Sequence, residues 1–68
     1  MQWIEEMNKM FASNPYTEGR VTIDFCENAN AIIVICCGIA NIIEVDKYTE
    51  YGLMIECMKT VDYLYKNV

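Results

Sequence analysis

Three carboxylates are the residues of this 68-residue chain whose types and spacing best suit chemistry. Glu44 and Asp46 are two residues apart in an alternating segment, which places them on the same face of a strand. Asp24 lies in a second alternating segment, from which it can approach them on a neighbouring strand. Paired carboxylates bind Mg²⁺ or perform acid–base catalysis, but strand faces also carry charge for solubility alone. Because no further motif accompanies the three, we favour a partner-binding role for them over a catalytic one.

The other residue types argue against an enzyme. The chain has no histidine, which removes the usual general base, the usual zinc ligand and the common nucleophile pairs. Its cysteines lack the two spaced pairs of a zinc site, and the adjacent Cys36 and Cys37 should point to opposite faces of a strand. We therefore expect no catalytic residue, no metal and no cofactor. The four cysteines are interpreted as free, buried thiols in a reducing compartment.

Hydrophobic periodicity predicts five elements that position these residues. Helices are predicted over 2–13 and 50–67, and strands over 20–26, 31–37 and 42–48. Thr49 is the predicted N-cap of the second helix. Residues 38–41 are predicted as a turn, although they could also continue a strand or form a short helix. The order indicates an α+β fold with two layers, α-β-β-β-α, in which N- and C-terminal helices pack on a three-stranded antiparallel meander. We expect one small domain over residues 1–68.

The middle predicted strand is apolar on both of its faces. Ile32 and Val34 point one way while Ile33 and Ile35 point the other, and a one-residue slip would exchange the two pairs. Whichever pair is inward, an apolar stripe remains on the face away from the helices. The outward residues of the flanking strands are Thr22, Asp24, Ile42, Glu44 and Asp46.

An apolar stripe with a polar rim is typical of an interface. We therefore predict self-association, most simply as a homodimer, through Ile33, Ile35 and Ile42. A loop folded over the stripe, or simple exposure of single isoleucines, is the alternative.

The net charge narrows the class of partner. Five basic residues against ten acidic ones give a formal net charge of -5, whereas nucleic acids and anionic membranes are bound by clustered lysine and arginine. The longest apolar run, residues 31–40, is about half the roughly 20 residues of a membrane span. The N-terminus also lacks the apolar segment of a signal peptide. We therefore expect a soluble, cytoplasmic protein that binds neither nucleic acid nor membrane but suits a protein partner with a basic surface.

Three functions remain open. In overall profile the chain resembles small acidic inhibitors encoded by viruses and mobile elements, among them anti-CRISPR and other anti-defence proteins. This resemblance implies a non-enzymatic protein of the host cytoplasm that binds and inhibits or regulates a protein partner, with Asp24, Glu44 and Asp46 contacting a basic groove. One alternative is an oligomer that sequesters a nucleotide or similar ligand through Arg20, lysines and tyrosines. The other is a structural assembly subunit.

Overall fold

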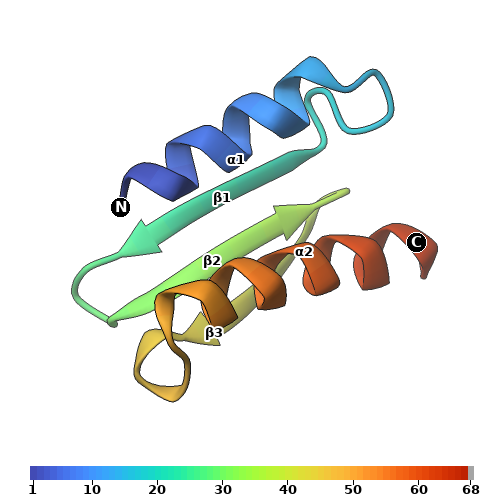
Figure 1. Cartoon of the computed structure of the whole chain (residues 1–68). Helices are drawn as coiled ribbons and strands as arrows, with labels where there is room; N and C mark the ends of the chain where they lie inside the picture. The colour runs from blue at the N-terminus through green and yellow to red at the C-terminus, as the bar shows by residue number, and fades with distance from the viewer. Residues whose placement is uncertain (68) are drawn as a thin grey trace.

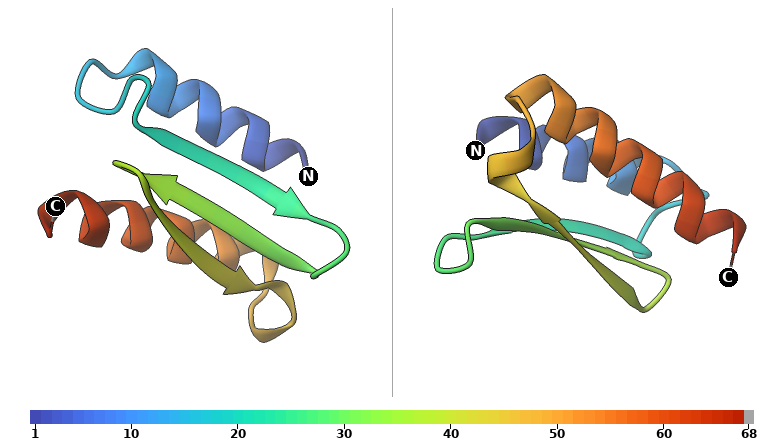
Figure 2. Two further views of the ribbon diagram at one scale, coloured as in Figure 1. Left: turned by 180° about the vertical axis from the view of Figure 1, so that it is seen from behind. Right: turned by 90° about the horizontal axis from the view of Figure 1, so that it is seen from below.

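The computed structural model describes residues 1–67, in which two α-helices pack on a three-stranded antiparallel sheet in the order α-β-β-β-α (Figure 1). The elements are α1 (Gln2–Ser13), β1 (Val21–Cys26), β2 (Ala31–Cys36), β3 (Ile39–Glu44), the 3₁₀ turn η1 (Val45–Lys47) and α2 (Glu50–Lys66). Both helices lie on the same face of the sheet, α1 against β1 and α2 against β2 and β3 (Figure 2). The predicted α+β fold is confirmed.

Helix α1 forms because its apolar residues recur at helical spacing. Trp3, Ile4 and Phe11 are buried on one side of the helix. The helix stops at Ser13 because Pro15 pushes the residue before it, Asn14, into extended backbone (φ -96°, ψ 122°). The Thr17 hydroxyl then donates to the carbonyl of Phe11 (2.6 Å), so the chain leaves α1 with one of its last carbonyls bonded.

Helix α2 starts at the predicted cap. The Thr49 hydroxyl accepts a hydrogen bond from the backbone N–H of Gly52 (3.1 Å) and satisfies one of the free donors of the first turn. Leu53, Cys57 and Val61 follow at four-residue intervals and are buried against the sheet. The predicted N-cap is therefore confirmed, and the helix ends at Lys66, one residue before the predicted end.

The turn between β2 and β3 is shorter than the sequence suggested. Cys37 and Gly38 both adopt left-handed backbone (φ 55° and 83°), which closes a two-residue hairpin of the I′ type. Strand β3 therefore begins at Ile39 and ends at Glu44. A third strand is confirmed, but its predicted bounds 42–48 are wrong: residues 39–41 also belong to the strand, as the alternative interpretation of 38–41 allowed, and the chain after Glu44 folds into η1.

The core lies between the sheet and the helices. On the sheet side, alternate residues of the strands are buried: Ile23, Ile32, Val34, Cys36 and Ile43. Because Val34 pairs with Ile23 on β1 and with Asn41 on β3, the inward face is continuous across all three strands. This register assigns Ile32 and Val34 to the core and leaves the other pair of β2 isoleucines on the opposite face.

Candidate functional site

The candidate site is the sheet face that the helices do not cover, here called the outer face. Its residues are Thr22, Asp24, Cys26, Ala31, Ile33, Ile35, Ala40, Ile42 and Glu44. Asp24, Ile33 and Ile42 are direct neighbours in one row across the three strands. Both helices lie on the other side of the sheet (Figure 2), and among the residues of this face only Ala31, at the start of β2, is buried.

The centre of the outer face is apolar. Ile35 is 41% exposed and Ile42 is 66% exposed, whereas Val34, one residue before Ile35, is fully buried. Ile33 lies opposite Ile42 in a non-hydrogen-bonded pair, where the Cα atoms are about 4.5 Å apart and side chains are closest. The structure therefore brings together Ile33, Ile35 and Ile42, the three residues predicted for self-association, on one face, where Ile35 and Ile42 are exposed and Ile33 is half-buried.

Two of the three predicted carboxylates lie at opposite sides of the outer face. Asp24 is on β1 and Glu44 on β3, so they are separated by two strand spacings, about 10 Å, across the sheet and by a further two residues along the strands. Asp24 accepts a hydrogen bond from the backbone N–H of Phe25 (2.9 Å), and Glu44 forms an ion pair with Lys47 (3.3 Å). They border the isoleucines and do not form a catalytic pair.

The third carboxylate, Asp46, lies off the sheet. It belongs to η1 and accepts a hydrogen bond from the side-chain amide of Asn30 (2.8 Å). The prediction that Glu44 and Asp46 share a strand face is wrong because β3 ends at Glu44. Residues 1–67 contain no cluster of three carboxylate or thiol side chains that could hold a metal ion.

The two free edges of the sheet differ. The Asn8 side chain of α1 accepts from the N–H of Ile23 (2.9 Å) and donates to its carbonyl (2.7 Å), so it replaces a neighbouring strand at the β1 edge. Sequence reasoning missed this residue. The signal was present, because Asn8 is a polar residue between Ile4 and Phe11 at helical spacing, on the apolar side of α1.

The two buried thiols, Cys36 and Cys57, are not activated for chemistry. Burial raises the pKa of Cys57 to about 11 and is also the main cause that raises the pKa of Cys36 to about 11. Both thiols are therefore protonated at neutral pH, so neither is an activated nucleophile. The expectation that Cys36 and Cys37 point apart is wrong: their Sγ atoms are 3.8 Å apart, because Cys37 lies in the turn.

The basic side chains are dispersed and mostly paired. The Arg20 guanidinium donates to the hydroxyl of Tyr65 (3.3 Å), and this hydrogen bond is the main cause that raises the pKa of Arg20. Three lysines form ion pairs on separate parts of the surface, Lys47 with Glu44, Lys59 with Glu56 and Lys66 with Asp62. The residues described do not gather these charges into a phosphate-binding cluster.

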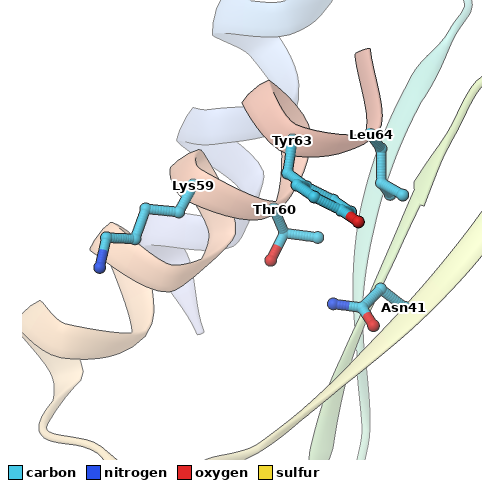
Figure 3. Close-up of a pocket in the computed structure, with 5 residues that line it drawn as sticks. All are labelled: Asn41, Lys59, Thr60, Tyr63 and Leu64. Atoms are coloured by element: carbon cyan, nitrogen blue, oxygen red, sulfur yellow. The ribbon is translucent and has the colours of Figure 1, made fainter. Parts of the chain in front are cut away.

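Within the described part of the chain, three hollows border α2. One, of about 230 Å³, lies between α2 and β3, where Thr60, Tyr63 and Leu64 point toward Asn41 (Figure 3). A second, of about 400 Å³, lies between the first turns of the two helices and is lined by Trp3, whose indole N–H has no hydrogen-bond partner among residues 1–67. A third, also of about 400 Å³, lies between α2 and the end of α1, where its lining includes Phe11, Val61 and Lys66. Among the residues described, none of the three has the several convergent cationic groups that a nucleotide phosphate requires.

Two further findings bear on function. Within residues 1–67, neither helix has the length and hydropathy needed to cross a bilayer. Comparison with models of protein families, with curated proteins and with solved structures gives no match to this chain.

Proposed function

We propose that this chain is a non-enzymatic protein that binds a protein partner through its outer face and thereby inhibits or regulates that partner. The observation that carries the proposal is the one-sided packing of the sheet. Both helices cover one face, and the opposite face presents exposed Ile35 and Ile42 with Asp24 and Glu44 at its two sides. An apolar centre with a charged rim is the usual anatomy of a protein interface.

The apolar centre and the charged rim of the outer face contribute differently to binding. Burial of an isoleucine side chain by the partner is worth about 1.5–3 kcal/mol and supplies affinity. Asp24, Glu44 and the formal net charge of -5 attract a partner with basic side chains around an apolar centre, which increases the association rate. Asp46 lies outside the outer face, so we assign the electrostatic contact to Asp24 and Glu44.

The size, acidity and lack of motifs of the chain bear on the kind of partner and on where the protein acts. Its resemblance to small inhibitors encoded by viruses and mobile elements supports a partner that belongs to a host defence system and an action in the host cytoplasm. The nucleotide-sequestering alternative is less well supported, because Arg20 and three of the lysines are engaged by neighbouring side chains on separate elements. A structural assembly subunit would use the same outer face.

Affinity capture with matched charge variants tests the proposal. The test variant is Asp24→Asn with Glu44→Gln, and the control is Glu5→Gln with Glu6→Gln, which removes the same charge from the exposed side of α1. We expect the wild type and the control to retain the same partner from host lysate, and the test variant to lose it. Raising the salt from about 0.05 M to about 0.5 M should also weaken capture, because the attraction is then screened.

The same capture experiment can also contradict the proposal. Equal retention by the test and control variants would contradict the proposal, as would capture that is indifferent to salt. The purified partner then permits the functional step, in which its own activity is measured with the wild type and with the test variant. Inhibition by the wild type alone is the expected result.

A further inference from the structure

The free edge of β3 is open, whereas that of β1 is closed. Among residues 1–67, no side chain bonds the backbone of β3, but Asn8 bonds both backbone groups of Ile23 on β1 and Asp24 bonds the N–H of Phe25. We propose that the open β3 edge pairs with β3 of a second copy of this chain, antiparallel across a two-fold axis. The two sheets then form one continuous sheet.

The hydrogen-bond pattern shows which backbone groups are free for this pairing. The N–H of Cys37 donates to the carbonyl of Arg20 (2.9 Å), so alternate residues of β2, from Ala31 to Ile35, bond β1 and those between them bond β3. Their partners on β3 are Ile39, Asn41 and Ile43. The backbone groups of Ala40, Ile42 and Glu44 therefore point away from the sheet, along the open edge.

Strand β3 lacks the features that usually prevent edge pairing. Such features are proline, lysine, an inward-pointing charge, a bulge or a covering segment. The sequence of β3 is IANIIE, its pairing with β2 is one-to-one over all six residues, and each of its residues except Ile43 is exposed. Exposed, regular and apolar, this edge is built for strand addition.

The geometry favours a second copy as the occupant because the edge complements itself. If the two-fold axis lies midway between the two copies of Ile42, these residues form a hydrogen-bonded pair. Ala40 then lies opposite the second copy's Glu44. The row of Ile33 and Ile42 on the outer face then continues into the same row of the second copy.

The charges permit this register. The two Glu44 side chains are four residues apart along the joined strands, about 14 Å or more, which exceeds the screening length of about 10 Å at 0.1 M salt. Each Glu44 is also paired with Lys47 of its own chain (3.3 Å). No like charges therefore meet at the paired edges.

The helical layer supplies the contact area that the paired strand edges do not provide. A specific interface takes about 800 Å² from each partner, roughly a sixth of the 4756 Å² that this chain exposes and more than one strand edge offers. Helix α2 lies beside the edge, and its Tyr63 is 65% exposed at the rim of the hollow over Asn41. A two-fold axis perpendicular to the sheet places both α2 helices on the same side, where these flanks meet.

This inference goes beyond the proposed function and does not depend on it. It leaves exposed Ile35 and half-buried Ile33 uncovered, so the outer face remains available to a different protein. It also differs from the predicted dimer, which buries the outer face itself. Ile42 is the only one of the three predicted residues that lies at the proposed contact.

Sedimentation equilibrium of edge and face variants distinguishes the two dimers. Ala40→Pro removes an N–H that points away from the sheet, so the pairing of β3 with β2 is kept. Ile35→Lys is the matched control, because it places a charge at the centre of the outer face and leaves the edge unchanged. We expect a wild-type dimer, a dimer for Ile35→Lys, and a dissociation constant raised by roughly 100-fold for Ala40→Pro, which loses edge hydrogen bonds.

A second variant protects the test against misfolding of Ala40→Pro. A synthetic chain with a methylated Ile42 amide keeps every side chain and removes the donor at the axis, and it should weaken the dimer in the same way. Slow hydrogen exchange at Ala40 and Ile42, lost on dilution, is the expected signature in the wild type. A monomeric wild type at millimolar concentration, or a dimer abolished by Ile35→Lys but not by the edge variants, would overturn the inference.

Discussion

Cys36 and Cys57 are fully buried and behave as small apolar residues of the core. Sequence reasoning predicted burial for all four cysteines, and these two confirm it. Cys26 and Cys37 are only half-buried. Cys26 is the last residue of β1, and Cys37 lies in the turn between β2 and β3. Exposure at such positions depends on what the rest of the fold covers, which local pattern does not encode.

The two buried thiols should make stability fall in alkali. Their pKa is raised from 9.0 to about 11 in the folded chain, so above pH 9 the unfolded chain releases protons that the folded chain retains. Their contribution is fully present below pH 9 and is lost as the pH rises toward 11. We expect the free energy of unfolding in urea to fall over this interval.

A variant with Cys36→Ala and Cys57→Ala gives the control for this prediction. Tyrosines and lysines titrate in the same interval, so the quantity to compare is the slope of stability against pH in the two proteins. The variant is less stable overall because of its cavities, but its slope should be shallower. Equal slopes would show that the thiols do not contribute.

At the scale of the element, helical and alternating patterns located most boundaries. Helix α1 was predicted as observed, and β1, β2 and α2 within a residue. The third strand was misplaced because Asn41 resembles a turn residue, while the actual turn uses Cys37 in left-handed backbone, which few non-glycine residues adopt. The pairing of all six β3 residues with β2 offsets the free-energy cost of that conformation. This stabilisation is not local, so the turn preferences of single residues do not include it.

Asn8 links α1 to the edge of β1, and its loss should be costly. Asn8→Ala leaves the partly buried N–H and carbonyl of Ile23 without partners, so we expect a loss of about 1–3 kcal/mol in the free energy of unfolding. Lys9→Ala, on the exposed side of the same helix, is the control and should change stability by less than about 0.5 kcal/mol. Chemical denaturation measures both, and similar values would contradict this role.

At the scale of the whole molecule, the proposed function depends on the division of the sheet into a covered and an uncovered face. The sequence showed that β2 is apolar on both faces but not which face is inward, because that depends on how the strands and helices pack together. It located Asp24, Glu44 and the three isoleucines, all of which the structure places on the outer face. It did not reveal the difference between the two edges, which depends on a contact between Asn8 and a strand 15 residues away.

A matched pair of substitutions tests which face is inward. Val34 is fully buried and the next residue, Ile35, is 41% exposed. Val34→Thr buries a hydroxyl in the core and should cost about 1–3 kcal/mol of stability. Ile35→Thr places its hydroxyl in water and should cost about 0.5 kcal/mol or less. The reverse order in urea unfolding would mean that the strand is turned the other way.

The closed edge at β1 also limits the size of any assembly. A sheet with two open edges accepts a new chain at each end, and repeated addition produces a filament. Here the Asn8 side-chain amide already occupies the β1 edge of the sheet through its hydrogen bonds to the backbone of Ile23. If β3 pairs as proposed, growth by strand addition therefore stops once a single partner strand is in place, and we expect the contact between Asn8 and β1 to prevent a filament.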